Sequence, residues 1–533
     1  MSATPGTPSP SDDLAPAGPA PPHVHPWVVS IAVMIGTFMV VLDTTVVNVS
    51  LPHIAGSLSS TVDETTWALT SYLAANAIVL PMTGWLGNHF GRKRVLILSL
   101  AGFTAASFLC GLAFNLASLI VFRILQGISG GTLQPISQAV LLEAFPPKDR
   151  GKAMGFFGLG IVVAPILGPV LGGWLTDNYS WRWVFYINVP VGIAAVIAAR
   201  MFVFDPPYIR RTAERVDGTG IFLLAIGIGA LQIALDKGRQ EDWFASHLIL
   251  LLFVLAVVGL ALFVLRALNT DHPIVHLSVF KDGTYSMGVF LTTLLGFVLY
   301  GSLVLLPILL QTLWGYPSID AGIAMAPRGV GSFIAMPLVG LLTVKMDARK
   351  LVVAGLLSGG LTLVWLSRLN LQAGYWDVFW PQFVQGIALS LLFVPLTTIT
   401  MAHIGREEMG NATSIFNLMR NIGGSIGIAI TSTMLVNRQQ FHRAVLGEHV
   451  NMYDPQVLAA VDRIRAMMMA RGADVVTATQ RAYALIAGQV QRQAAMMAFL
   501  DMFWLLGVLF IVAIPLVFLM RATRGGETVM VSE

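Results

Sequence analysis

The sequence is poor in charged residues and nearly free of cysteine. Charged residues make up 11% and hydrophobic residues 56% of the 533, whereas about 25% of the residues in a soluble domain are charged. This composition excludes an ordinary soluble domain. The single cysteine, Cys110, lies within an apolar run and has no second cysteine to pair with, so no disulfide forms within the chain.

Signals for several other protein classes are also absent. The first 26 residues contain no Lys or Arg and are rich in Pro, Ser and Ala, which predicts a disordered tail (1–26) and not a cleaved signal peptide. The isoelectric point near 9.2 reflects basic residues in short loops, which set membrane orientation and do not indicate binding to nucleic acid. The ten histidines are scattered, so no metal site, cofactor or membrane-embedded enzyme is indicated.

Long apolar runs recur from one end of the chain to the other. Each is long enough to cross a hydrocarbon core of about 30 Å as a helix. These runs predict an all-α integral membrane protein with fourteen transmembrane helices. We place the helices at 27–51, 65–86, 95–113, 118–143, 152–175, 184–204, 218–235, 246–267, 284–311, 320–344, 351–369, 378–403, 411–436 and 497–520.

Lys and Arg gather in alternate short loops. The opposite short loops hold only Arg182, Lys237 and Arg239, with Arg368 at the edge of a span. Because Lys and Arg in short loops mark the cytoplasmic side, both termini are predicted to be cytoplasmic and the long segment 437–496 to lie outside. The basic loops lie at 92–94, 148–152, 210–215, 281, 345–350, 406 and in the tail 521–533.

Two pairs of segments indicate an internal repeat. PMTGWLGNHFGRKRVL at 81–96 is similar to PLVGLLTVKMDARKLV at 337–352, and ILQGISGG at 124–131 is similar to FVQGIALS at 383–390. Repeats of this kind predict two halves of parallel topology, at 27–204 and 268–520. The offset is about eight spans long instead of six, so two helices in 205–267 are predicted to be inserted between six-helix halves.

Asp43 is the one charged residue in the apolar run from Trp27 to Leu51. A charge near the middle of a bilayer costs about 3 kcal/mol by insertion scales, so such a residue usually titrates, pairs or binds a cation. The alternative is a carboxylate that only ties helices together. Arg123 is a second deep charge; a guanidinium keeps its proton, so it either tunes Asp43 or braces a helix by bonding backbone carbonyls. The second repeat has Gln382 at the matching place.

Five segments resemble, in order, the signature segments of the fourteen-span drug:proton antiporters of the major facilitator superfamily. They are LDTTVVNVSLP (42–52), GWLGNHFGRKRVL (84–96), LIVFRILQGISGG (119–131), APILGPVLGGWL (164–175) and WRWVFYINVPVG (181–192). LQIALDKGRQEDWF (231–244), DHPIVHLSVFKDGTYS (271–286) and WPQFVQGIALSLLFVPLTTITM (380–401) are similar to the EmrB subgroup. The resemblance covers about residues 27–520. Asn88 departs from it, because the loop motif usually carries Asp there, so no gating salt bridge is expected through this position.

The resemblance implies the major facilitator fold and roles for particular residues. It ties Asp43 and Arg123 to proton coupling, and it implies a kinked, close-packed seam between the halves around Pro169. This seam is proposed for the glycine-rich stretch from Gly155 to Gly173, and ordinary close packing of helices explains these glycines equally well. Asp347, in the second copy of the loop motif, is expected to pair across the cytoplasmic gate. The gating candidates are Gly84, Gly91, Arg92, Gly127, Gly168, Pro169, Gly172 and Gly173.

Aromatic and polar residues within the spans are candidates for a drug pocket. Aromatic residues also anchor spans at the membrane interface, so each has a structural alternative. Arg328 and Arg420 lie deep in the C-terminal half, and the sequence names no partner for them. The candidates are Phe38, Asn48, Tyr72, Gln126, Phe297, Tyr300, Gln311 and Asn417.

The segment 437–496 predicts a helical hairpin that projects outwards. Asp454-Pro455 is a helix start, and Val457, Leu458, Val461, Ile464 and Met468 fall on one face before Gly472. A second helix is expected from about Thr477 into the last span. The stripe either packs on the protein itself or binds another protein. By resemblance, the partners are a periplasmic adaptor like EmrA and an outer-membrane channel like TolC.

Together these features predict a proton-driven multidrug exporter of the inner membrane that moves small hydrophobic drugs, and not an enzyme. The alternatives are an exporter that works without an adaptor and a solute:proton symporter. A receptor is a poor fit, because no long cytoplasmic loop offers an output domain.

Overall fold

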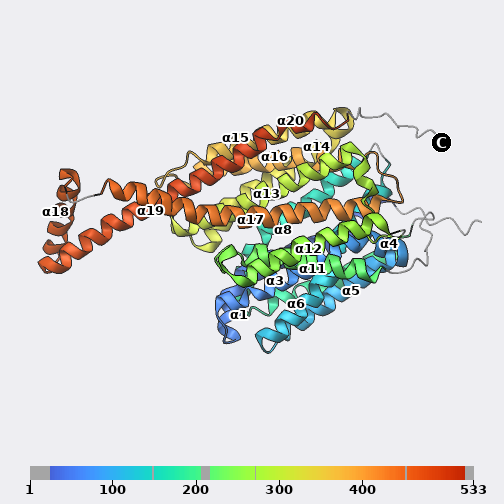
Figure 1. Cartoon of the computed structure of the whole chain (residues 1–533), viewed down its shortest axis with the longest axis horizontal. Helices are drawn as coiled ribbons and strands as arrows, with labels where there is room; N and C mark the ends of the chain where they lie inside the picture. The colour runs from blue at the N-terminus through green and yellow to red at the C-terminus, as the bar shows by residue number, and fades with distance from the viewer. Residues whose placement is uncertain (1–24, 147–148, 206–216, 271, 451–452, 522–533) are drawn as a thin grey trace, which may run out of the picture.

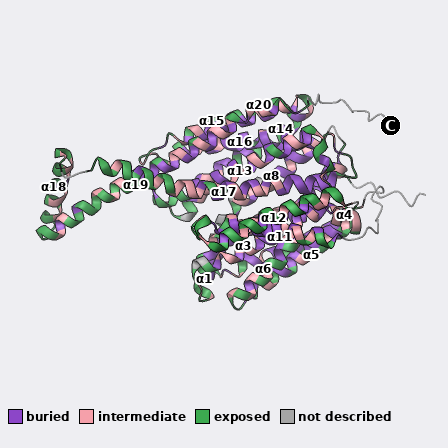
Figure 2. Cartoon of the chain, in the orientation of Figure 1, coloured by how far each residue is buried: buried purple, intermediate pink, exposed green. Residues whose placement is uncertain are grey.

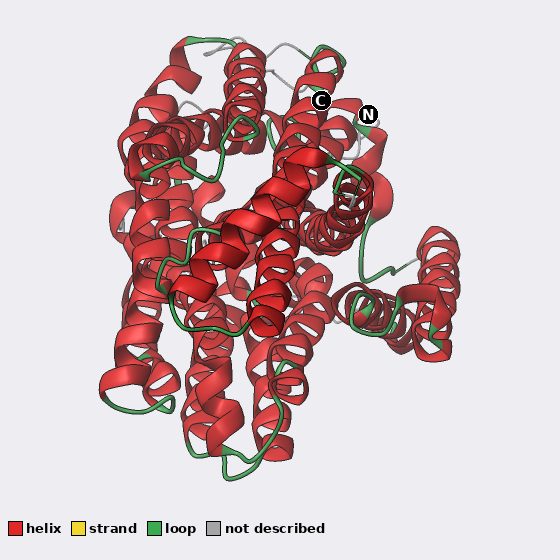
Figure 3. Cartoon of the chain, turned by 90° about the vertical axis from the view of Figure 1, so that its left-hand side faces the viewer, coloured by secondary structure: helices red, strands yellow, loops and turns green. Residues whose placement is uncertain are grey.

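A computed structural model of the chain describes residues 25–146, 149–205, 217–270, 272–450 and 453–521. The described residues form helices joined by short loops, with no strand among them (Figure 3). The predictions made for residues 1–24, Lys148, 210–215 and 522–533 lie outside these ranges.

The N-terminal half contains six spans, several of them broken. Two of the boundaries between spans have clear local causes: Gly91, with φ of 90°, separates α4 from α5, and a capping box of Asn115 and Ser118 begins α6. A short helix, α2 (Val62–Thr65), lies between the first two spans. The spans are α1 (Pro26–Ser57); α3 (Trp67–Val79), the 3-10 turn η1 (Leu80–Met82) and α4 (Thr83–Phe90); α5 (Arg92–Gly111); α6 (Leu116–Gly130) with α7 (Leu133–Ala144); α8 (Arg150–Asn178); and α9 (Trp183–Tyr186) with α10 (Asn188–Phe202).

Two further helices follow, and then the C-terminal half. Asp217 and Asp282 begin α11 and α13 by accepting hydrogen bonds from backbone N–H groups in the first turn. The helices are α11 (Gly218–Lys237), α12 (His247–Asn269), α13 (Gly283–Thr312), α14 (Ser318–Lys345), α15 (Ala348–Leu366), α16 (Tyr375–Thr400), α17 (Met409–Glu448), α18 (Pro455–Ala470), α19 (Val475–Val512) and α20 (Ile514–Val517), with 3-10 turns η3 (Trp243–Ala245) and η4 (Leu277–Lys281).

Each of the fourteen predicted spans corresponds to a helix or a broken run of helices. Within the described residues, eleven helices are long and apolar enough to cross a membrane, or twelve if the bent α8 is one span. The other two spans are the broken run α3–η1–α4 and the helix α17. The sequence of α17 is more polar than those of the other spans. α8 bends by about 40° between Pro165 and Val170. The all-α membrane fold is therefore confirmed.

The two halves meet at one end of the bundle, which we call the basic end because Arg92, Lys93 and Arg349 lie there. One buried apolar cluster spans both halves at this end, and it joins Phe157 of α8 with Met336 of α14 and Phe416 of α17. Elsewhere each half has its own buried cluster. The protein is therefore closed at the basic end, and toward the opposite end the cores of the halves are separate (Figure 2).

α11 makes polar contacts with both halves. Thr70 of α3 donates a hydrogen bond to Asp236. On the other side, Ser425 of α17 donates to Gln232 over 3.0 Å. α11 therefore lies alongside both halves, and α12 packs on α11.

The C-terminal half carries a helical projection beyond the bundle (Figure 1). α17 runs on to Glu448, α18 begins at Pro455, and α19 begins at Val475 and continues into the last span. Asp474 caps α19, and hydrogen bonds from the side chain and backbone of Thr477 lower the pKa of the Asp474 carboxyl. The helical hairpin is as the sequence predicted.

The apolar stripe of α18 is used mainly inside this hairpin. Val461 is only 4% exposed, and Ala478 and Ala482 of the facing α19 are fully buried. Leu458, in contrast, is 44% exposed. Of the two alternatives given for the stripe, packing on the protein itself holds for Val461, because the hairpin packs on itself.

Candidate functional site

The Asp43 carboxylate lies fully buried among three donors from two helices, α6 and α10. Arg123 Nη1 donates to Asp43 Oδ2 over 2.6 Å. Gln126 Nε2 and Asn188 Nδ2 both donate to Asp43 Oδ1, over 3.0 and 2.8 Å. An ionised carboxylate has only acceptor sites, and all three contacts suit that form.

Arg123 is held from several sides. Its Nη1 also donates to Gln126 Oε1 over 2.6 Å, and its Nε donates to the carbonyl of Ala68 over 3.1 Å. The guanidinium lies 4.0 Å from the centre of the Tyr72 ring, a cation–π contact. Arg123 therefore makes both contacts that the sequence left as alternatives, because it pairs with Asp43 and also bonds a backbone carbonyl.

The arrangement can couple a proton to a change of structure. Neither side chain of the ion pair is exposed to solvent, so the carboxylate cannot exchange a proton until the surrounding helices move. A proton on Asp43 would remove its charge and leave Arg123 as an unpaired charge, which is costly in a buried place. Protonation of Asp43 would therefore favour movement of these helices, and such movement would in turn allow protonation.

Asn188 was not among the residues singled out from the sequence. It begins α10 and bridges Asp43 to Ser107 Oγ over 3.1 Å. The available signal was an uncharged polar residue in an apolar run, followed by Pro190. That signal is weak, because one amide in a span is common and nothing in the sequence shows which helix it faces.

The gating candidates at the basic end lie where the halves meet. Arg92 is buried and forms an ion pair with Glu143 at the end of α7, within the N-terminal half. An added Cβ at Gly84 would lie 2.6 Å from Cα of Asn411 in α17, so only glycine permits this approach of α4 to the other half. Gly91 makes the turn before Arg92 with a positive φ.

Asp347 does not reach across this end. It caps α15 and pairs with Arg349 over 2.9 Å, and both residues belong to the C-terminal half. The expected pairing across the gate is therefore wrong, because a closer basic partner lies two residues away in the chain.

The glycines of α8 serve two different contacts. Gly168 and Gly172 pack against Thr45 and Val46 of α1, in the same half, and Gly173 contacts nothing closely. Contact with the other half is made nearer the start of α8, where an added Cβ at Gly155 would lie 2.8 Å from the carbonyl of Met336 in α14. The seam between the halves thus lies nearer the start of α8 than predicted, because the helices meet at the basic end. The side chain of Pro169 lies outside those described.

The candidate drug-contacting residues do not form one pocket in this conformation. Tyr72 and Gln126 belong to the Asp43 network, and Gly127 lies directly against the backbone of Tyr72. Asn417 donates to Gln138 across the two halves. The others are separate: Phe38, Phe297 and Tyr300 are half-buried, and Asn48 and Gln311 are exposed. Among the described residues, no group of His, Cys, Asp and Glu could hold a metal ion.

Comparison with known proteins identifies the family. The profile of the Major Facilitator Superfamily matches residues 33–428. The chain is 38% identical to the multidrug export protein EmrB of Escherichia coli K12, over 93% of this chain and 96% of that protein. The chain belongs to the major facilitator superfamily, in its EmrB group. It is therefore a membrane transporter and not an enzyme.

Other relatives agree with this assignment. The chain is 38% identical to the fatty acid resistance protein FarB of Neisseria gonorrhoeae, over 93% of this chain and 96% of that protein. A solved structure of the proton:xylose symporter XylE, 14% identical, superposes with a TM-score of 0.59 and covers 94% of this chain and 97% of that one. At this identity the likeness concerns the fold alone.

Proposed function

We propose that this chain is a proton-driven multidrug exporter of the inner membrane with both termini in the cytoplasm. The relatives that are named multidrug export proteins, at 38–40% identity, support drugs as the cargo. The excess of Lys and Arg at the basic end supports a cytoplasmic position for that end. In this orientation the conformation described above is closed toward the cytoplasm.

The observation that carries proton coupling is the buried pair of Asp43 and Arg123. Inward movement of one proton releases about 2.3 kcal/mol per 100 mV. The carboxylate is the proton carrier, Arg123 holds its charged form, and Gln126 and Asn188 fix its orientation. Opening toward either side of the membrane would change these contacts and with them the proton affinity.

Everted membrane vesicles test this function. After respiration acidifies the vesicle interior, addition of a transported drug should release part of the pH gradient, because drug enters as protons leave. Asp43→Asn, at equal abundance in the membrane, should abolish this response. Drug-dependent loss of the gradient that is the same in Asp43→Asn and wild type would remove Asp43 from the coupling mechanism. A symporter is distinguished by the direction of the drug, which would leave the vesicles together with protons.

The hairpin is the place where a periplasmic adaptor like EmrA would bind, and a channel like TolC would complete the assembly. Support comes from apolar side chains that the hairpin leaves exposed within residues 453–474, among them Leu458, Met467 and Met469. Replacing residues 453–474 by a Gly/Ser linker should leave exchange in liposomes intact and reduce resistance in a cell with two membranes. Full resistance with that variant would favour the exporter that works without an adaptor.

A further inference from the structure

Arg420 of α17 is a buried charge without a partner. It is 2% exposed, and none of its three guanidinium nitrogens has a hydrogen-bond partner among the described residues. Its carbonyl packs against Gly296 of α13, and its guanidinium lies 5.7 Å from the centre of the Phe393 ring in α16. A buried charge without a counter-ion is unfavourable, and deep in a membrane it usually marks a functional position.

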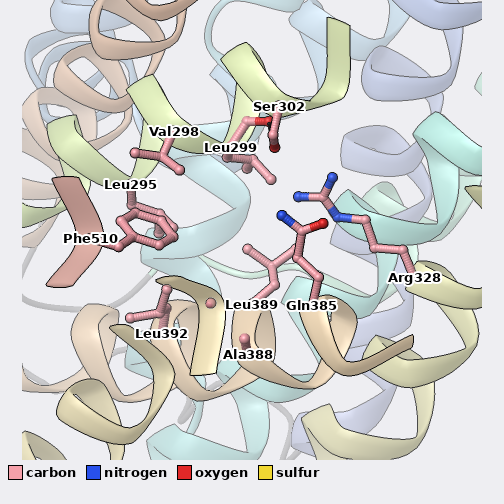
Figure 4. Close-up of a pocket in the computed structure, with 11 residues that line it drawn as sticks. Leu295, Val298, Leu299, Ser302, Arg328, Gln385, Ala388, Leu389, Leu392 and Phe510 are labelled. Carbon is pink, nitrogen blue, oxygen red and sulfur yellow. Dashed lines mark hydrogen bonds between the residues drawn. The ribbon is translucent and has the colours of Figure 1, made fainter. Parts of the chain in front are cut away.

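Arg328 of α14 is a second such residue, and it lies in a small cavity. It is 5% exposed and forms no ion pair with any described carboxylate. Figure 4 shows its guanidinium pointing into the cavity toward Gln385 of α16 and Ser302 of α13. The rest of the lining is largely apolar, with Leu295, Leu389 and Phe510 among its members.

The same region holds a polar atom that lacks a partner. Gln382 Nε2 donates to Gln385 Oε1 over 3.1 Å, but Gln382 Oε1 is buried without a donor. Buried polar atoms in native proteins are nearly always hydrogen-bonded, so an unsatisfied oxygen beside a cavity that holds a guanidinium marks a place where a ligand or a water is expected.

The N-terminal half offers a comparison at similar burial, an arginine that has a counter-ion although its Nη2 has no hydrogen-bond partner among the described residues. Arg123 has Asp43, whereas for Arg328 and Arg420 the part of the chain that the structure describes provides no carboxylate. Among the described residues the buried charges of the two halves are therefore asymmetric: the pair of Asp43 and Arg123 is neutral overall, whereas Arg328 and Arg420 have no counter-ion.

We propose that Arg328 and Arg420 recognise the anionic group of an amphiphilic cargo, a carboxylate or sulfonate on an apolar body. A guanidinium binds such groups through paired N–H donors. The cavity beside Arg328, about 10 Å³, holds about one water in this conformation, so the leucines and Phe510 that line it would meet the apolar part of the cargo only after this half opens. The two arginines are specificity-determining residues that act on the charge of the cargo and not on the proton. This inference rests on the proposed drug transport.

A pair of matched fluorescent probes tests the inference. Anilinonaphthalene sulfonate has one fixed negative charge, and phenylnaphthylamine has the same rings without the sulfonate. Binding of each probe is measured on the purified full-length protein in lipid nanodiscs, with protein-free nanodiscs subtracted. The variants are Arg420→Gln, Arg328→Gln and Arg420→Lys, and the control is Arg239→Gln, which changes an exposed arginine.

Each Gln variant should bind the sulfonate about tenfold more weakly, because one charge-assisted hydrogen bond is lost, and should bind phenylnaphthylamine as wild type does. Arg420→Lys should retain part of the affinity, and the control all of it. The melting temperature of Arg420→Gln should not fall, since an unpaired charge is removed.

Two results would overturn the inference. Unchanged affinity for the sulfonate would exclude contact with the anion. Equal loss for both probes, with a lowered melting temperature, would show that the arginines only support the fold. Transport is assayed separately: failure of the wild-type protein to move either probe under a pH gradient would count against the proposed transport function, whereas the binding comparison would still decide the role of the arginines.

Discussion

Removal of the Asp43 charge should destabilise the protein as well as abolish coupling. In Asp43→Asn the Arg123 guanidinium keeps its place between Ala68 and Tyr72 but loses its only counter-ion among the described residues. Breaking one side of a buried ion pair costs about 3–5 kcal/mol, whereas replacing both partners by uncharged residues is often nearly neutral. Asp43→Asn should therefore lower the free energy of unfolding by about 3–5 kcal/mol.

A double-mutant cycle separates this effect from general damage. Arg123→Met should also destabilise the protein, and Asp43→Asn combined with Arg123→Met should be clearly more stable than the sum of the single changes predicts. The double variant should still lack proton coupling, because the Asp43 carboxylate, the proposed proton carrier, is gone. Asp320→Asn, an exposed carboxylate in the first turn of α14, is the control and should change stability by less than about 0.5 kcal/mol.

Cys110 provides the assay. It is the single cysteine in the sequence, it is fully buried, and its sulfur lies 3.6 Å from Gln126 Oε1 in the Asp43 network. A thiol-reactive dye therefore reports opening of the network directly as the denaturing detergent is increased. If the single variants unfold like wild type, or if the double variant shows the full sum of the two losses, the two charges are not energetically coupled and the reasoning fails.

Three further outcomes are expected. Arg123→Lys should transport poorly at normal abundance, because one ammonium cannot reproduce the planar contacts to Asp43, Gln126 and Ala68; drug efflux under a fixed pH gradient checks this, and efflux above half the wild-type rate would contradict it. Asn188→Leu should shift the pH dependence of transport, because one of the three donors to the Asp43 carboxylate is lost; an unchanged pH profile would show that Asn188 is not a positioning residue. Gly155→Leu should prevent closure at the basic end, since its side chain would overlap Met336 of α14. Cross-linking of cysteines introduced across that contact should therefore fall. The control is Gly173→Leu, at a glycine without close neighbours, and transport and cross-linking equal to those of the control would contradict the expectation.

The spans and the importance of the two deep charges were largely predictable from the sequence, because burial in a membrane restricts the composition. Asp43 and Arg123 each stood out as a charged residue in an apolar run, whereas their contact with each other is known only from the structure. The hairpin was predictable from Asp454-Pro455 and Gly472, which are local signals. Each of these features depends on residues near one another in the chain or on the high cost of a deep charge.

Contacts between helices were less predictable. The choice of Gly155 over Gly168 for the seam depends on how α8 crosses α14, and small residues occur all along α8. The partner of Val461 depends on how the hairpin folds back, and a stripe of apolar residues does not show which surface covers it. Asn188 was missed for the same reason, because its role comes from the face of α10 that it occupies.

The continuity of α19 has a mechanical consequence. The helix runs without a break from the tip of the hairpin into the bundle, and its part from 475 to 496 is about 33 Å long at 1.5 Å per residue. A rigid-body rotation of about 15°, of the size known between protein subunits, would swing that tip through about 9 Å. The helix therefore acts as a lever: a small rotation of the C-terminal half would become a larger displacement at the end of the hairpin, which a protein bound there would follow.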